Sequence, residues 1–466
     1  MKIYSYIKQL TKGPVPKSPP KEQLAAVNLE LQHKLRQTLR RRQAARQYFF
    51  IDIAGTCNLR CPSCPVGNMT STASKGLMDR DKFSAILDKI ERENSGRTFI
   101  DLYNWGEPLL HPMVSDFVRE TKARGMGCGI STNLNIDTRL RDVVKSGPDY
   151  IRISLSGFYN DSYKQTHRGG DINIVKGNMY MLRYWLDRYK SDTVVEIGFH
   201  IYRSNFPHDF MRMRELCDEL GFVFAPVLAA YMPAEKAAEA ISGNPSENDR
   251  KLLDNLVLAP ALWEKTYNDE SIFTPDCQYR KDRTAINFDG SVPLCCAVYE
   301  DDKIIARDFT TMPMADIVER KYSHSFCATC MSHGLHQVYT GVPAEGFEKE
   351  AIRVLGPLYQ AYVDENRQIG DPLHLYYDGR LQSAQHLYDN AMAALQMGDR
   401  PAARRILSAI IDEVPEFGEA YYQIGRILWQ DGEKDAALAA IRNAVALAPD
   451  HNAYTHELKL MEKNAA

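Results

Sequence analysis

Between residues 48 and 227, short apolar segments alternate with longer amphipathic ones. The short segments predict six β-strands, at Tyr48–Ile53, Thr98–Tyr103, Gly127–Ser131, Tyr150–Ser154, Val194–Ile201 and Phe222–Val227. The stretches between them have apolar residues at helical spacing, most clearly at Asp79–Glu93, Pro112–Arg124, Asn173–Tyr189 and Asp209–Leu220. Strands that alternate with helices predict a parallel α/β sheet, curved into a full or partial barrel. We expect the chemistry of such a fold in the loops at the carboxyl ends of its strands.

The pattern changes on both sides of this region. Residues 1–20 contain four prolines, which predicts an irregular arm, and Lys21–Tyr48 has leucines near helical spacing. The arginines at residues 40–42 could contact an anionic partner, but a solvated helix face is the favoured interpretation. After Ser271 the pattern is irregular, and Ala344–Asp378 is mixed and mostly helical in character.

The last part of the chain repeats at an interval of 34 residues. Five small, aromatic or turn-forming residues recur at this offset: Tyr388, Ala391, Gly398, Ala402 and Pro415 align with Tyr422, Gly425, Gly432, Ala436 and Pro449. Small residues let paired helices approach, glycine ends the first helix and proline ends the second. The pattern resembles two tetratricopeptide (TPR) hairpins, and Tyr454–Lys463 is expected to be their closing helix.

Composition and charge narrow the class of protein. The 466 residues are 44% hydrophobic and 25% charged, as in a globular protein of several domains, and the formal charge of −3 argues against nucleic-acid binding by overall electrostatics. No segment approaches the ~20 apolar residues of a membrane span, and Met1–Lys12 lacks the apolar block of a signal peptide. We therefore expect a cytoplasmic protein that binds neither nucleic acid nor membrane.

Eight of the ten cysteines fall into two groups. The first group is 57, 61 and 64, and the second is 277, 295, 296, 327 and 330. Core packing does not require short cysteine spacing, and a reducing compartment disfavours disulfides, so metal or redox use is favoured for both groups. The single Cys128 and Cys217 are expected to be buried packing residues.

The first group lies in the loop after the first predicted strand, as Cys57-Asn-Leu-Arg-Cys61-Pro-Ser-Cys64. Three thiolates can hold three irons of a [4Fe–4S] cube and leave the fourth iron open for a small molecule. Zinc is the less favoured alternative, because no fourth ligand follows closely. The motif resembles that of the radical S-adenosylmethionine (SAM) family, in which the open iron chelates SAM. The resemblance implies a partial (β/α)6 TIM-like barrel, although Ser63 stands where relatives commonly have an aromatic residue.

Further positions follow the order of that family's SAM site. Gly106 and Glu107 come after the second strand, where relatives hold the SAM ammonium, and we expect Glu107 to serve binding more than folding. Ser131, Asn133 and Ser154 end the third and fourth strands and could meet the SAM ribose, and Arg168 is placed like an arginine that pairs with the SAM carboxylate. Each could instead be an ordinary loop residue.

The second group resembles the auxiliary-cluster extensions called SPASM and twitch. By the twitch pattern, Cys277, Cys295, Cys327 and Cys330 would hold one four-coordinate [4Fe–4S] cluster, and structural zinc is the main alternative. Asp289-Gly290 predicts a hairpin turn between strands at Thr284–Phe288 and Ser291–Leu294. Cys296 is left over, either as packing or as a thiol facing the active site and a weak catalytic candidate.

These observations predict five segments: an arm and helix (1–47), a radical SAM core (48–270), a small cysteine-rich α+β cluster domain (271–342), a helical linker (343–382) and all-α TPR repeats (383–466). The resemblance implies an oxidoreductase-type enzyme that generates a 5′-deoxyadenosyl radical with electrons from a flavodoxin or ferredoxin. The favoured substrate is a peptide or protein, docked by the TPR repeats and oxidised or crosslinked. Dehydrogenation or epimerisation of a small sugar or alcohol is the alternative, and a TPR adaptor with a structural metal domain is the second alternative.

Overall fold

The structure is a computed structural model that describes residues 47–69, 76–94, 98–243, 245–269, 276–340, 345–369, 375–377, 380–382, 384–415, 417–449 and 451–465. The predicted arm and nearly all of the predicted first helix lie outside the described residues. The last two residues of that helix, Gln47 and Tyr48, belong to the first strand of the sheet.

The centre of the molecule is a parallel sheet whose strands lie in the order β6-β5-β4-β3-β2-β1-β7. Six of them confirm the predicted strands: β1 (Gln47–Ile51), β2 (Thr98–Asp101), β3 (Gly127–Thr132), β4 (Tyr150–Leu155), β5 (Val194–Ile201) and β6 (Val223–Leu228). The seventh, β7 (Arg283–Ile286), pairs with β1 in parallel register. The predicted hairpin at 284–294 is therefore wrong in its pairing, although its turn is present, with Gly290 at φ +89°. The boundary predicted at residue 270 thus runs through one continuous sheet.

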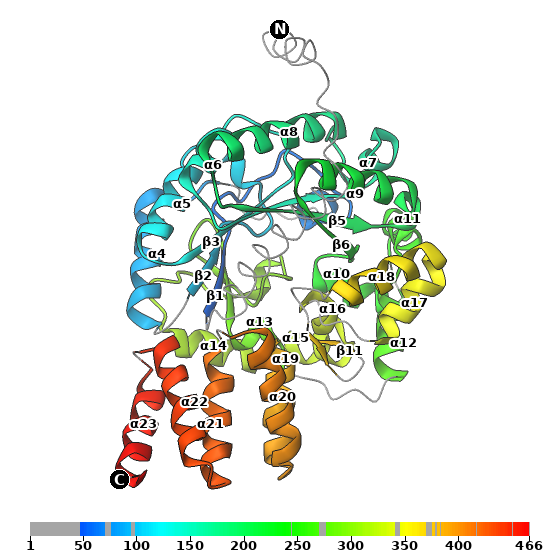
Figure 1. Ribbon diagram of the computed structural model, residues 1–466. Helices are drawn as coiled ribbons and strands as arrows, with labels where there is room; N and C mark the ends of the chain where they lie inside the picture. Colours follow the sequence, from blue (N-terminus) through cyan, green and yellow to red (C-terminus); the bar gives the residue numbers. More distant parts are fainter. Residues whose placement is uncertain are drawn as a thin grey trace, which may run out of the picture.

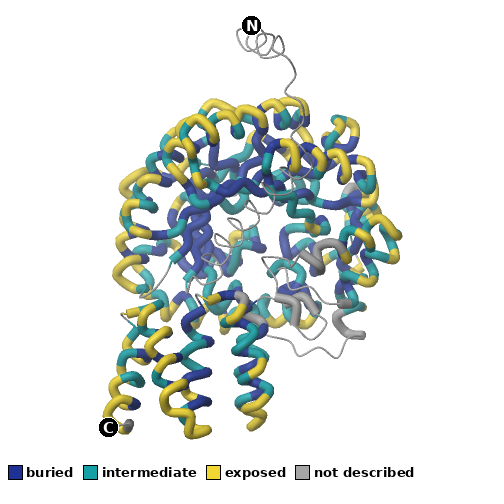
Figure 2. Tube along the Cα trace, viewed as in Figure 1, coloured by how far each residue is buried: buried dark blue, intermediate teal, exposed yellow. Residues whose placement is uncertain are grey.

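Helices cover the outside of this sheet (Figure 1). The main ones are α4 (Arg80–Glu93), α5 (Val114–Ala123), α6 (Leu140–Ser146), α8 (Ile172–Tyr189) and α9 (His208–Leu220), with the short α3 (Pro65–Asn68) and α7 (Asn160–Thr166) in loops. Buried residues run along the strands and the inner sides of the helices, while the outer helix faces are exposed (Figure 2). The curved sheet with helices on one face is the partial barrel that the alternating pattern predicts.

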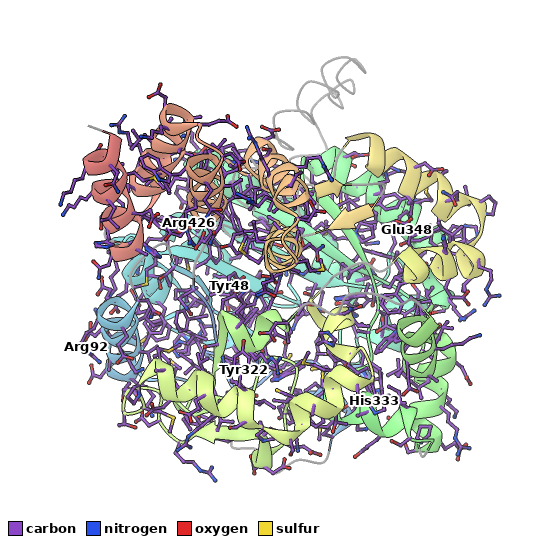
Figure 3. All side chains as sticks on the ribbon, turned by 90° about the horizontal axis from the view of Figure 1, so that it is seen from below. Tyr48, Arg92, Tyr322, His333, Glu348 and Arg426 are labelled. Atoms are coloured by element: carbon purple, nitrogen blue, oxygen red, sulfur yellow. The ribbon has the colours of Figure 1, made fainter. Side chains whose placement is uncertain are left out.

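The two faces of the sheet differ in chemistry. Outward residues such as Phe49, Ile151 and Ile197 are apolar and belong to the main core beneath the helices. The residues between them point inward, because side chains alternate along a strand, and many of these inner residues are polar: Asp52, Asp101, Ser131, Arg152, Ser154, Glu196 and His200. In the view from below, the inner residue Tyr48 lies near the middle of the molecule, whereas Arg92 lies at its edge (Figure 3). The barrel therefore has an apolar outer layer and a polar interior.

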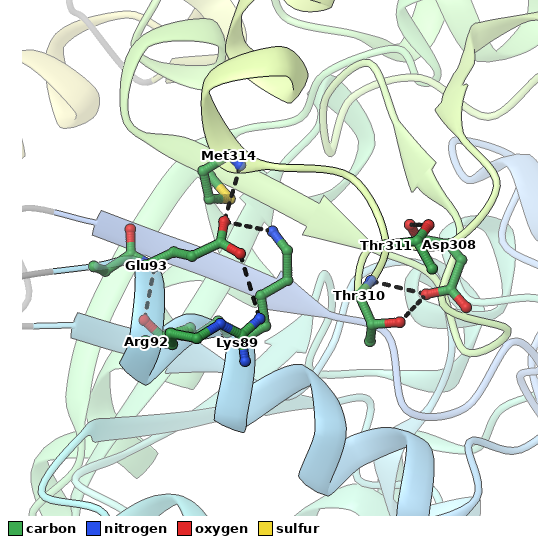
Figure 4. Close-up of polar contacts among 9 residues, drawn as sticks. Lys89, Arg92, Glu93, Asp308, Thr310, Thr311 and Met314 are labelled. Atoms are coloured by element: carbon green, nitrogen blue, oxygen red, sulfur yellow. Dashed lines mark hydrogen bonds and ion pairs between the residues drawn. The ribbon is translucent and has the colours of Figure 1, made fainter.

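The segment after β6 packs against the barrel as helices and short strands. Its elements are α10 (Ala234–Ile241), α11 (Glu247–Asn255), α12 (Pro260–Asp269), α13 (Gln278–Lys281), the antiparallel pair β8 (Val292–Pro293) and β9 (Ile304–Ala306), α14 (Met314–Ser323), α15 (Ser325–Ser332), α16 (Leu335–Thr340), α17 (Glu345–Leu355) and α18 (Pro357–Ile369). A clamp joins α14 to the barrel helix α4: the Glu93 carboxylate accepts from Lys89 Nζ at 2.9 Å and from Met314 N at 3.0 Å (Figure 4).

The repeats form an array of helices at one end of the barrel (Figure 1). A small antiparallel pair, β10 (Leu375–Tyr377) and β11 (Arg380–Gln382), precedes the two hairpins α19 (Ala384–Gln396)–α20 (Arg400–Glu413) and α21 (Gly418–Gln430)–α22 (Lys434–Leu447), and α23 (Asn452–Ala465) closes the array. This confirms the predicted hairpins and closing helix. Gly398 and Gly432 adopt φ of +81° and +83° between paired helices, as expected of the repeated glycine. The array has its own apolar core, and Lys281 Nζ contacts Asp389 Oδ1 across to α13 at 2.8 Å. None of the described helices is both long and apolar enough to span a membrane.

Candidate functional site

Cys57, Cys61 and Cys64 lie together in the loop that leaves the carboxyl end of β1. Cys64 is the N-cap of α3, its backbone N–H donates to Cys61 O at 3.1 Å, and each thiol is partly exposed. Burial raises the pKa of Cys57 to about 11 and that of Cys64 to about 12. Thiols in such surroundings ionise only when a cation compensates, which is the usual condition of metal-ligating cysteines.

The loops after β2 and β3 meet this cysteine loop. Glu107 N donates to Thr56 O at 2.8 Å, and Asn133 Nδ2 approaches Cys57 Sγ at 3.6 Å and Asn58 Oδ1 at 2.9 Å. Gly106 is fixed by sterics, because a Cβ there would lie 1.4 Å from Ala54 O. Residues from three consecutive strand ends therefore form one site, as the order of motifs predicts.

Glu107 is buried, with 2% of its surface exposed, and its carboxylate is bound inside the protein. Oε1 accepts from Leu109 N at 3.0 Å and from Thr132 Oγ1 at 2.7 Å, and Oε2 accepts from Asn133 N at 2.8 Å. Burial raises the pKa of Glu107 to about 7, although these hydrogen bonds act in the opposite direction. The described contacts give Glu107 the role of fixing the end of β3, and its contact with SAM stays a prediction.

The other residues predicted for SAM divide into two places. Ser131 Oγ and Ser154 Oγ lie 3.1 Å apart on neighbouring strands of the inner face. Arg168 is exposed, and it lines a surface depression of about 470 Å³ with Asn58, Lys164 and Gly169. Its backbone O accepts from Arg60 N at 2.9 Å, which ties it to the cysteine loop. The structure thus brings Ser131, Asn133 and Ser154 to the strand ends and Arg168 to the rim.

The second set of cysteines surrounds a single cavity. Cys277, Cys295, Cys327 and Cys330 all line it, together with Tyr279, His336 and Tyr339. They come from three places: Cys277 from the start of α13, Cys295 from the loop after β8, and Cys327 and Cys330 from α15. Burial raises the pKa of Cys327 to about 11. Four thiols around one cavity suit one four-coordinate cluster, whose sulfur donors these residues would supply.

Cys296 faces away from that cavity. It packs with Tyr48, Phe50, Phe99 and Ala285, which form a small apolar cluster on the inner face of the sheet. Tyr279 belongs to both surroundings, since it lines the cavity and its ring meets Phe50 at a centroid distance of 6.3 Å. Cys295 therefore lines the cavity, whereas the adjacent Cys296 packs against the apolar cluster on the inner face of the sheet.

Sequence reasoning missed the charged groups inside the barrel. Arg152 on β4 forms an ion pair with Glu196 on β5, and Gly198 leaves room for the guanidinium. Burial raises the pKa of Asp52 to about 6 while its carboxylate accepts from the backbone of Trp105 and Gly106. The signal was present as polar residues at every second position of otherwise apolar strands.

Among the described residues, no three His, Cys, Asp or Glu side chains converge as they would around one metal ion. A [4Fe–4S] cube distributes its thiolates over separate irons, so its ligands need not converge on one point. Both cysteine sets fit a cluster in residue type and in grouping.

Two protein families match separate parts of the chain. Residues 51–184 match the family model of the radical SAM superfamily, and residues 388–452 match that of the tetratricopeptide repeat. The chain therefore contains a radical SAM domain and a TPR segment, and the radical SAM family implies a SAM-binding [4Fe–4S] cluster.

Individual relatives are similar over part of their length. A tungsten-containing aldehyde ferredoxin oxidoreductase cofactor-modifying protein of Pyrococcus furiosus is 37% identical over 111 residues, which are 23% of this chain and 30% of that protein. A GTP 3′,8-cyclase of Limosilactobacillus fermentum is 31% identical over 132 residues, which are 28% of this chain and 39% of the cyclase. The chain thus spans less than two fifths of the length of these relatives.

Solved structures of low identity also resemble the chain. Native anSMEcpe with bound AdoMet has a TM-score of 0.42 at 14% identity, and the match covers 69% of this chain and 100% of that one. SuiB of Streptococcus suis bound to S-adenosylmethionine has a TM-score of 0.41 at 11% identity, over 63% and 68% of the two chains.

Proposed function

We propose that this protein is a radical SAM enzyme that oxidises or crosslinks a peptide or protein substrate. The observation that carries the proposal is the meeting of three strand-end loops at Cys57, Glu107 and Asn133, inside a barrel with a polar interior. Barrel enzymes hold their reactive groups at this end of the strands. A cluster bound by the three cysteines would supply the electron that splits SAM into methionine and a 5′-deoxyadenosyl radical.

The chain's own residues would hold SAM and exclude water. Ser131 and Ser154 present paired hydroxyls from neighbouring strands, which suits a ribose diol. Gly106 lets the loop after β2 pack closely against Ala54, and Asn133 holds the loop of Cys57 against the end of β3. Fixed positions of this kind allow a reactive species to form beside its target and nowhere else.

The second set of cysteines favours an oxidative outcome. A cluster at Cys277, Cys295, Cys327 and Cys330 would have no open position for substrate and could accept an electron. Tyr279 connects the two places, since it lines the cavity and packs against the apolar cluster on the inner face of the sheet. Short distances between a reacting centre and an acceptor suit electron transfer.

The TPR array supports a macromolecular substrate, because the concave side of such an array is a binding surface. A flavodoxin or ferredoxin is the proposed electron donor. The exposed cations Arg60, Lys164 and Arg168 beside the cysteine loop would suit a carrier of acidic surface.

A second candidate is dehydrogenation or epimerisation of a small sugar or alcohol. It is favoured by the polar interior, where Asp101, Arg152, Glu196 and His200 could bind hydroxyl groups.

Iron analysis and SAM cleavage test the proposal. Anaerobically reconstituted protein should hold about eight irons and about eight sulfides in two cubes. Changing Cys57, Cys61 and Cys64 together to alanine should leave about half of each and abolish 5′-deoxyadenosine formation. The matched controls are Cys128→Ala and Cys217→Ala, which remove buried thiols outside both sites and should keep the full iron content.

Two results would oppose the proposal. Cleavage of SAM by the triple variant would show that Cys57, Cys61 and Cys64 are not needed for this reaction. Stoichiometric zinc at the second set of cysteines after anaerobic purification would mean that this set has a structural role and does not accept electrons.

A further inference from the structure

The inference concerns Lys321, a lysine on α14 beside the second cysteine cavity. Three lysines are buried among the described residues: Lys89, Lys303 and Lys321. Lys89 is paired with Glu93, and Lys303 with Asp302. Lys321, with 1% of its surface exposed, has no carboxylate at ion-pair distance in the described part of the chain.

The ammonium of Lys321 is instead held by neutral oxygens. Nζ donates to Arg283 O at 2.7 Å, to Thr284 Oγ1 at 3.0 Å and to Tyr279 O at 3.4 Å. These contacts fix the amine under the segment that joins α13 to β7, but they do not neutralise its charge. A buried cation is costly unless an anion compensates it.

The amine lies next to the cysteine cavity, because Tyr279, whose carbonyl accepts from Lys321 Nζ, also lines that cavity. Two carboxylates of this region already have other cations beside them. Asp282 Oδ1 lies 3.8 Å from Arg283 Nε, and Asp276 is paired with Arg280. Thiolates that bind metal in this cavity would supply the counter-charge that the neutral oxygens around Lys321 do not.

We infer that Lys321 is the built-in counter-charge of the cluster at Cys277, Cys295, Cys327 and Cys330, and that it sets how easily this cluster is reduced. The inference rests on the proposed function, which places a cluster there. A nearby buried cation stabilises the more negative, reduced state of an anionic four-thiolate cluster. Lys321 is therefore a positioning residue that tunes an electron acceptor and touches no substrate.

Potentiometric titration followed by electron paramagnetic resonance tests the inference. The parent protein is the Cys57, Cys61 and Cys64 triple alanine variant, in which only the second cluster remains. In it, Lys321→Gln should shift the reduction equilibrium at least tenfold toward the oxidised form, or about 59 mV for a one-electron couple. Lys321→Arg keeps the charge and should stay within threefold, as should Arg320→Gln, which removes an exposed charge from the same helix.

Each outcome decides the matter. An unchanged potential in an iron-loaded Lys321→Gln variant makes the lysine a packing residue and overturns the inference. If Lys321→Gln holds no iron, iron retained by Lys321→Arg supports a charge requirement, and iron lost from both overturns it. A parent without iron or signal refutes the second cluster itself, so failure of the proposed function is recognised before Lys321 is changed.

Discussion

At the scale of single residues, Glu107 shows how one side chain can serve both architecture and binding. Its carboxylate receives three internal hydrogen bonds, which favour a role in folding beside the predicted role in binding. In Glu107→Gln an amide N–H must face a backbone N–H or the Thr132 hydroxyl. We expect unfolding free energy to fall by about 1–3 kcal/mol, the penalty for an unsatisfied buried donor, and SAM affinity to fall as well. Urea unfolding and anaerobic titration with SAM measure the two effects.

The pH dependence of this effect has a defined sign. Burial raises the pKa of Glu107 from its ordinary value of 4.5 to about 7 in the folded protein, so the folded state binds this proton more tightly than the unfolded chain. Its stabilising contribution is complete below the unfolded value and is lost as pH rises through the folded value. The advantage of the wild type over Glu107→Gln should therefore be larger at pH 5 than at pH 8. An equal difference at both pH values would contradict the raised pKa.

At the scale of elements, the clamp between α4 and α14 holds the segment with the second set of cysteines on the barrel. Glu93 neutralises the buried Lys89, whose amine lies 4.3 Å from the Phe309 ring centroid, and it also accepts from the first N–H of α14. An acidic group at a helix N-terminus is favourable in its own right. Glu93→Gln leaves Lys89 uncompensated and should cost about 1–3 kcal/mol, the value of a hydrogen bond to a charged group. Chemical denaturation followed by fluorescence measures this loss.

The control is Glu91→Gln on the same helix, whose exposed pair with Arg124 should contribute no more than about 0.5 kcal/mol. Burial alone would raise the pKa of Glu93, but the hydrogen bonds from Lys89 and Met314 and the charge of Lys89 together outweigh burial, and the pKa is lowered. The stabilisation is therefore present above the unfolded pKa and is lost as pH falls through the folded one. Equal stabilities of the Glu91 and Glu93 variants at neutral pH would refute the clamp.

At the scale of the whole molecule, the TPR array and the barrel have separate cores. The array's apolar cluster shares no residue with the main core, and Lys281–Asp389 is a half-exposed pair of small energetic value. Deleting Ser383–Ala466 should therefore preserve iron content and substrate-free SAM cleavage. Turnover of a macromolecular substrate, or assembly with a partner, should fall. Comparison of uncoupled cleavage with turnover in both proteins measures the difference.

Two other results of this deletion would contradict the docking of a substrate by the TPR array. If iron content and both activities decrease together, the array braces the barrel and does not dock a substrate. If neither activity changes and size measurements reveal no lost partner, the repeats act outside this reaction.

The sequence by itself determined the features that depend on local periodicity. Six strands and four main helices lie within a few residues of their predicted bounds, because alternating and helical spacing record which face of each element is buried. The first cysteine motif needs only one loop, and the TPR hairpins need only neighbouring helices, so short-range spacing is sufficient for both. The resemblance of the second cysteine set to a cluster domain predicted that its four members lie around one place, which local spacing could not.

Only the tertiary structure decided the features that depend on distant partners. Residues 283–286 alternate like a hairpin strand, yet they pair with β1, and strand pairing is not encoded in a single segment. Glu107 and Lys321 have the sequence context of exposed residues, but the ends of β3 and the α13–β7 segment bury them. Cys295 and Cys296 are neighbours in the chain that face a cavity and the barrel interior, respectively. The environment of a charged or reactive group is set by the elements packed around it, and these come from parts of the chain that no local pattern connects.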